Sequence, residues 1–158
     1  MLAAITLRNT GYEAIIALIV ANFLAQFIKY ARDFRKHGRS NLTLLVATGG
    51  MPSSHSSTVT ALSTSVGLTA GWDSPVFAVA VCLAFIIMFD AAGLRRSASL
   101  QAQALNVIID ELLAPDHRLN RSKLKEFLGH TPREVIAGAL LGVAVSLGLR
   151  GLLVVLGN

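Results

Sequence analysis

The chain has 158 residues, of which 53% are hydrophobic and only 15% are charged, whereas a soluble domain usually carries about 25% charged residues. Its 14 Lys and Arg residues against 9 Asp and Glu give a net charge of +5, which excludes an acidic disordered chain, and its single cysteine excludes a disulfide scaffold. A basic, apolar chain of this length is either a nucleic-acid binder or a membrane protein with a single domain.

The placement of the charges separates these two alternatives. No Asp, Glu, Lys or Arg lies between Glu13 and Lys29. The stretches 41–72, 74–89 and 135–149 lack them as well. Lysine and arginine gather between these stretches, which is typical of a membrane protein with several spans. We therefore predict an integral membrane protein with no nucleic-acid partner.

The first predicted span covers residues 12–28 and is followed by a basic stretch at 29–39. Asn22 and Gln26 lie four residues apart, so they share one helical face. We expect this face to contact other helices, either as a polar site or as simple packing. Residues 41–52 contain two glycines and a proline, and we interpret them as a loop or a short re-entrant segment.

The second predicted span, 53–70, is rich in Ser, Thr and Ala, which suits a helix surrounded by other helices. Ser74 is a candidate N-cap and Pro75 a candidate first residue of a third span that extends to residue 89. Within that span we expect Cys82 to pack as a small apolar residue.

The polarity of the chain changes after Ser97. Apolar residues recur at helical spacing with polar residues between them, which predicts an amphipathic helix that ends at Pro115. The last predicted span covers residues 132–156. The fold expected for residues 1–158 is therefore one all-α domain, a membrane helical bundle of about four spans plus one amphipathic helix.

Four spans in alternating directions bring the end of the first, the start of the second, the end of the third and the start of the fourth to one membrane face. Of all lysines and arginines, only Arg8 and Arg150 fall on the opposite face. By the positive-inside rule the crowded face is cytoplasmic. Candidate functional residues from distant segments gather on it.

The first candidate segment, residues 49–57, reads Gly-Gly-Met-Pro-Ser-Ser-His-Ser-Ser. Glycines allow a ligand to approach the backbone, and Ser53 and Ser54 add hydroxyl donors at a predicted helix start, which attracts anions. His55 can exchange a proton near neutral pH. The alternative is a capped, Ser-rich helix start with an incidental histidine.

The second candidate segment contains Arg95 and Arg96. Arginine suits bidentate contact with phosphate oxygens, but a pair of arginines after a span is also a common signal that stops membrane transfer. Asp90 either orients an arginine or a histidine or simply ends the span.

The third candidate segment surrounds His130. Thr131 and Glu134 fit a capping box with Pro132 at the first helical position, which leaves His130 without a structural role. Glu134 could instead hydrogen-bond the imidazole and make it a better nucleophile. The histidines are not spaced as metal ligands, and we expect His37 and His117 to be solvated.

The segments TGGMPSSHSS, FDAAGLRRSA and LGHTPREVIAG together resemble the divergent PAP2 family of small bacterial and plastid membrane proteins. The Pro-Ser-Ser-His run is also similar to the Pro-Ser-Gly-His motif of the wider superfamily of type 2 phosphatidic acid phosphatases and vanadium haloperoxidases. Three segments in order, spread over nearly the whole chain, make the resemblance specific. It implies a bacterial inner membrane or a plastid membrane as the location.

The resemblance implies a metal-independent phosphatase without a cofactor. His130 takes the place of the nucleophile that forms a phosphohistidine, Glu134 that of the carboxylate that orients it, and His55 that of the general acid. Ser53, Ser54 and Lys29 take the places of phosphate-binding residues. Arg95 and Arg96 are a further inference of ours, because Leu124 stands where the third motif carries an arginine.

The expected function is therefore hydrolysis of a lipid phosphate monoester or diphosphate, such as phosphatidic acid, phosphatidylglycerol phosphate or a polyprenyl diphosphate. The irregular motifs leave a second possibility, a membrane protein that binds phosphate or anionic lipid without catalysis. A purely structural bundle would not explain the three segments, and haloperoxidases are typically larger and soluble. The partners expected are the lipid substrate, membrane lipids and, because a bundle this small buries little surface, a second copy of the chain.

Overall fold

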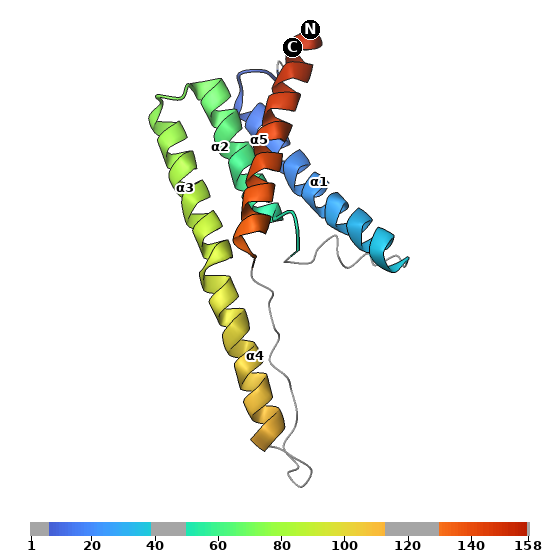
Figure 1. Cartoon of the computed structure of the whole chain (residues 1–158). Helices are drawn as coiled ribbons and strands as arrows, with labels where there is room; N and C mark the ends of the chain where they lie inside the picture. The colour runs from blue at the N-terminus through green and yellow to red at the C-terminus, as the bar shows by residue number, and fades with distance from the viewer. Residues whose placement is uncertain (1–6, 39–49, 113–129, 158) are drawn as a thin grey trace.

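The computed structural model describes residues 7–38, 50–112 and 130–157 (Figure 1). Within these ranges it contains five α-helices and no strand. The helices are α1 Gly11–His37, α2 Ser54–Ala70, α3 Pro75–Ala92, α4 Leu94–Leu112 and α5 Pro132–Val155. The all-α fold predicted from the sequence is confirmed.

Three helices, α1, α3 and α5, are long and apolar enough to cross a membrane, and they coincide with three of the predicted spans. The remaining predicted span is α2, a helix of 17 residues with many Ser and Thr side chains. It still extends from one end of the bundle to the other. The N–H of Ser53, before its first turn, donates to the carbonyl of Glu134 across 3.0 Å, and near its other end the carbonyl of Leu68 accepts from Arg150 Nη2 at 3.4 Å. α2 packs against α1, α3 and α5 (Figure 1).

Small side chains let α1 and α2 approach closely. Ala17, Ala21 and Ala25 follow at four-residue spacing, which places them on one face of α1, and each is 0% exposed. Ala17 and Ala21 form a core with Ala61 of α2. The Ser57 hydroxyl donates to the carbonyl of Ala21 across 3.2 Å. Close backbones and hydroxyl bonds of this kind are typical of helices packed within a membrane.

The alanine face corrects the expectation for Asn22 and Gln26. Asn22 is exposed and Gln26 is half-buried, so the pair does not form the contact face of α1. The alanines permit a closer approach of the helix backbones than amide side chains would, and the dispersion gained by that approach decides which side of α1 faces its neighbours.

α2 and α5 are in still closer contact. A Cβ added to Gly142 would overlap the hydroxyl of Thr60 and the carbonyl of Ser57, and it would lie 2.8 Å from the backbone nitrogen of Ala61. One turn further along α5, the Ser146 hydroxyl donates to the carbonyl of Ala61 across 2.7 Å. The absence of a side chain at Gly142 therefore sets the distance at which these hydroxyl bonds can form.

α3 contributes only a narrow face of small residues to the bundle. Its buried residues are Ala80, Ala84 and Ala91, whereas Cys82 is exposed. Cys82, predicted to pack as a small apolar residue, does not pack against the other helices, because it projects from a different side of α3 than the alanines do.

α4 continues from α3 and extends away from the bundle (Figure 1). The two helices meet at Gly93, whose carbonyl accepts from the N–H of Ser97 across 2.9 Å. The predicted amphipathic helix is thus present and begins slightly earlier than expected, at Leu94. Its predicted end at Pro115 lies outside the described residues.

An ion pair between a buried glutamate and a partly exposed arginine closes one end of the bundle. Glu13, which is 1% exposed, accepts from Arg150 Nη1 at 2.8 Å and from the N–H of Asn9 at 2.9 Å through its Oε2. Arg150 also donates to Asn9 Oδ1 at 2.7 Å. With its bond to Leu68 described above, this one arginine joins the start of α1, the end of α2 and the end of α5.

Candidate functional site

The other end of the bundle brings the three candidate segments together. The N–H of His130, just before α5, donates to the carbonyl of Ala91 in the last turn of α3 across 3.1 Å. As described above, Ser53 donates to Glu134, which joins the starts of α2 and α5. The end of α3 and the starts of α2 and α5 therefore meet on one side of the bundle, in the arrangement inferred from alternating spans.

His55 and His130 are neighbours at this junction. Their ring centroids lie 5.9 Å apart with an interplanar angle of 81°, an edge-to-face arrangement. His130 is only 2% exposed, whereas His55 is half-buried. His55 lies in the first turn of α2, and His130 directly precedes the N-cap of α5. Each imidazole is therefore held at the amino end of a different helix.

The serines before His55 have structural contacts of their own. Ser53 is the N-cap of α2, and its Oγ accepts from the N–H of Ser56 at 3.3 Å and from the Ser56 hydroxyl at 3.0 Å. It is 0% exposed. Ser54 is 4% exposed, and its Oγ accepts from Lys29 Nζ at 3.4 Å. Of the two serines, Ser54 is thus the one in contact with a cation.

Lys29 reaches this junction because of its position on α1. It follows Ala25 by four residues and so continues the alanine face that packs against α2. The lysine is 7% exposed, and its stem passes Gly50, where an added Cβ would lie 3.7 Å from Lys29 Cδ. A lysine is rarely buried without a polar or charged partner. Here Ser54 supplies a hydroxyl.

Arg32 makes a contact with the turn before α2 that was not predicted from the sequence. Its Nη1 donates to the carbonyl of Met51 across 3.2 Å, and so holds the turn before α2 against the end of α1. The signal was present, since Arg32 lies three residues after Lys29 and therefore on the same side of the helix.

The capping box predicted at the start of α5 is confirmed. Thr131 Oγ1 accepts from the N–H of Glu134 at 3.4 Å, and Glu134 Oε2 accepts from the N–H of Thr131 at 2.8 Å. The carboxylate thus has a structural role, and the role that the resemblance implies for it, orienting His130, stays a prediction.

The electrostatics of the junction favour an anion. The amino ends of α2 and α5 each carry the partial positive charge of a helix dipole, and unpaired N–H groups at such ends bind phosphate and carboxylate groups. Lys29 adds a full positive charge beside them. Among the described residues, no three His, Cys, Asp or Glu side chains are grouped so that they could hold a metal ion.

Comparison with known proteins identifies the family. The model of the divergent PAP2 family matches residues 11–145, which is most of the chain. The chain belongs to the divergent PAP2 family. It is also 41% identical over 145 residues to a Bacillus subtilis (strain 168) protein described as "Uncharacterized membrane protein YuiD", a match that covers 85% of this chain and 92% of that protein. No solved structure matches the chain.

In this divergent PAP2 protein, the two arginines predicted to bind phosphate lie at the start of α4. Arg95 and Arg96 lie in its first turn, directly after the end of α3. Their side chains lie outside the described part of the structure, so the contacts predicted for them stay predictions. Asp90 is half-buried in the last turn of α3 and precedes Ala91, to which His130 is hydrogen-bonded. α3 ends two residues later at Ala92, and the two roles considered for Asp90 stay predictions.

Proposed function

We propose that this divergent PAP2 protein is a membrane-embedded phosphatase that hydrolyses a lipid phosphate monoester or diphosphate. The observation that carries the proposal is the pairing of His55 and His130, with centroids 5.9 Å apart, at the amino ends of two helices and beside a buried lysine. Two histidines and a cation at an anion-attracting junction could supply a nucleophile, a general acid and charge stabilisation for phosphoryl transfer without a metal.

In the proposed reaction, a ring nitrogen of His130 attacks phosphorus while the bond from phosphorus to the lipid oxygen breaks. His55, as the imidazolium, donates its proton to that oxygen, so the lipid leaves as an alcohol, or as a monophosphate from a diphosphate. His55 then accepts a proton from water, which attacks the phosphohistidine and releases inorganic phosphate. General acid–base catalysis of this kind contributes about 10²–10⁴-fold to rates.

The cationic residues would hold the phosphoryl oxygens as charge develops on them. Lys29 and the backbone N–H groups at the helix starts are fixed in place by the packing of the bundle, and preorganised donors stabilise a transition state without rearranging. Ser53, Ser54, Arg95 and Arg96 complete the proposed phosphate site, and Glu134 orients His130. By the positive-inside rule the site opens to the cytoplasm.

The test is phosphate release from purified protein in lipid or detergent. Phosphatidic acid, phosphatidylglycerol phosphate and a polyprenyl diphosphate are compared for wild type, His130→Ala and His55→Ala. His37→Ala is the matched control, because His37 is exposed on α1 and paired with Asp33 at 2.9 Å. We expect loss of release from the first two variants only. Equal release from all four proteins would overturn the proposal.

The leaving group separates the roles of the two histidines. The anion of p-nitrophenol leaves without protonation, so His55→Ala should retain far more activity on p-nitrophenyl phosphate than on phosphatidic acid. His130→Ala should lose both activities, because the nucleophile is needed for either substrate.

The departures in the motifs favour a second function, binding without catalysis. Ser54 stands in place of a glycine, and Leu124 in place of an arginine. Protein that binds vanadate or anionic lipid but releases no phosphate from any of these substrates would establish this alternative.

A further inference from the structure

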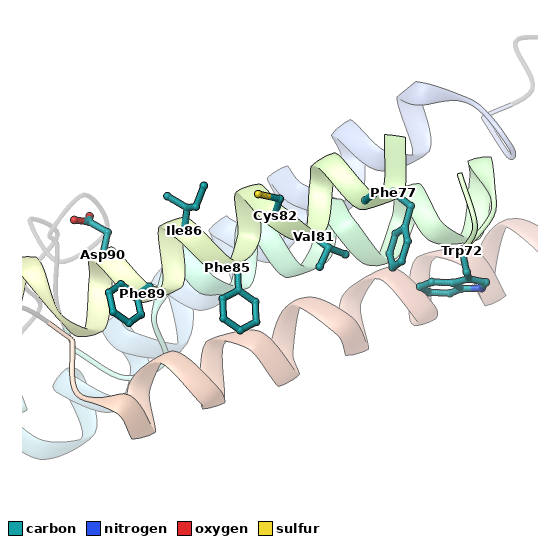
Figure 2. Close-up of a pocket in the computed structure, with 9 residues that line it drawn as sticks. Trp72, Phe77, Val81, Cys82, Phe85, Ile86, Phe89 and Asp90 are labelled. Carbon is teal, nitrogen blue, oxygen red and sulfur yellow. The ribbon is translucent and has the colours of Figure 1, made fainter. Parts of the chain in front are cut away.

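A long apolar groove of about 970 Å³ extends along α3 (Figure 2). Trp72 lines one end of it and Asp90 the other, with Phe77, Phe85 and Phe89 between them. Ligand pockets are commonly of about 300–1,000 Å³ and mostly apolar with a few polar groups, which describes this groove.

The groove exists because of how α3 packs. The helix turns its alanine face to the bundle, and its large aromatic residues project from another side (Figure 2). Phe85 is 70% exposed and Phe89 73% exposed, so the protein leaves the sides of these rings uncovered. A surface of this kind within a membrane is available to an apolar chain.

The polar end of the groove adjoins the candidate site. Asp90 lines that end, and the next residue, Ala91, accepts the hydrogen bond from the backbone of His130 across 3.1 Å. This end of the groove and the histidine pair therefore lie at the same end of α3. At the other end, Trp72 packs edge to face against Phe77, with centroids 5.1 Å apart.

The length of the groove suits one chain of a membrane lipid. Phe77 and Phe89 are separated by roughly 18 Å along the axis at 1.5 Å per residue. One leaflet is about 15 Å deep, since the hydrocarbon core of a bilayer is about 30 Å thick. A chain that starts near Asp90 can therefore lie along the part of the groove near Phe89 and Phe85 within one leaflet, and the groove continues beyond it to Trp72.

We propose that this groove binds the apolar chain of the lipid whose phosphate group is bound at the junction formed by His55 and His130. The inference rests on the proposed function, because that function supplies the phosphate head group. It adds that α3 binds the chain, so that the substrate is a lipid with a long apolar chain rather than a small soluble phosphate ester. Chain binding in the groove would hold the phosphate against His130, which turns the reaction of the two groups into an effectively intramolecular one.

The first experiment measures binding without turnover. Full-length His130→Ala protein in nanodiscs is irradiated with phosphatidic acid that carries a diazirine in its chain, and the modified peptides are mapped. Phosphatidylcholine with the same chain is the control lipid. We expect phosphatidic acid to label the groove residues of α3 preferentially. Equal labelling by both lipids, labelling of other faces, or cross-linking of α3 to a second copy would overturn the proposal.

The second experiment fills the groove. Cys82→Trp places a bulky ring among the lining residues, whereas Leu83→Trp places the same ring on an exposed side of α3 that does not line the groove. We expect Cys82→Trp to raise the KM for long-chain phosphatidic acid roughly tenfold, because the ring takes up space that the chain would otherwise occupy, and Leu83→Trp to leave this KM unchanged. Equal KM values for the two variants would contradict the proposal.

The two experiments separate this proposal from the function it rests on. Preferential labelling without phosphate release from any substrate would support lipid binding in the groove and reject the phosphatase activity. Phosphate release without preferential labelling would support the phosphatase activity and reject lipid binding in the groove.

Discussion

Lys29 Nζ lies 3.4 Å from Ser54 Oγ, a contact between residues 25 positions apart in the sequence. The contact joins the end of the alanine face of α1 to the first residue of α2. A buried ammonium group is costly unless its hydrogen bonds and charge are compensated. An anion at the amino ends of α2 and α5 would compensate it.

Lys29→Met is expected to weaken the binding of vanadate or phosphate by roughly ten- to a hundredfold, because a hydrogen bond to a charged group contributes about 1.5–3 kcal/mol. The thermal midpoint should stay the same or rise, since the variant removes a buried cation. Titration calorimetry checks the affinity. Lys36→Met, which changes an exposed lysine of the same helix, should bind as wild type does. Matching affinities for the two variants would show that Lys29 does not contact the anion.

Gly142→Ala is expected to destabilise the bundle by about 1–3 kcal/mol, as overpacking usually does. The new methyl group would meet Thr60 and the backbone of α2, which cannot rotate aside. Unfolding in a mild detergent measures the change. Gly148→Ala is the control on the same helix, because nothing lies within 4 Å of an added Cβ there. It should be neutral or stabilising by about 0.5–1 kcal/mol. If both variants unfold alike, the α2–α5 contact is looser than described.

Glu134→Gln separates the two roles of this side chain. Glutamine completes a capping box as glutamate does, so the free energy of unfolding should hardly change, whereas Glu134→Ala should cost about 1 kcal/mol. Phosphate release should fall in both variants, because both remove the carboxylate charge that, under the proposed function, orients His130. Full activity in Glu134→Gln would mean that Glu134 acts only in the capping box of α5 and does not orient His130.

Glu13→Leu and Arg150→Met should each destabilise the protein strongly, since breaking a buried ion pair by removing one partner costs about 3–5 kcal/mol. The double variant should be more stable than either single variant, because neither charge is then left alone. Chemical unfolding of the four proteins gives the coupling energy. Additive losses would mean that the 2.8 Å contact contributes little. Vanadate affinity should be unchanged throughout, as the pair lies at the opposite end of the bundle from the histidines.

Local signals in the sequence predicted local structure well. Ser74 caps α3 by accepting from the N–H of Phe77 at 3.2 Å, Pro75 is its first residue, and the capping box forms at Thr131. Cap chemistry acts within three residues, so no knowledge of the fold is required. To predict that His55 lies near His130, local signals were not enough. This prediction also used the alternating direction of the spans, which brings distant helix starts to one end of the bundle.

The rotation of each helix about its axis was not predicted. In a soluble protein, the change from apolar to polar residues shows which face is buried, but a membrane helix is apolar on all sides. This is why Asn22 was expected inside and is exposed, and why Cys82 was expected to pack and instead lines a groove. The four-residue spacing of Ala17, Ala21 and Ala25 was the usable signal, and its continuation to Lys29 would have predicted the burial of that lysine.

The hydroxyl-rich composition of α2 has a consequence for how the protein enters the bilayer. Insertion of a helix by the translocon depends on its own apolar content. Unlike α1, α3 and α5, α2 is not long and apolar enough to cross a membrane by this criterion alone. Its hydroxyl groups are satisfied largely by carbonyls of its own backbone and of its neighbours, among them those of Ala21 and Ala139. We therefore expect α2 to pass from the translocon into the bilayer together with a neighbouring helix rather than alone.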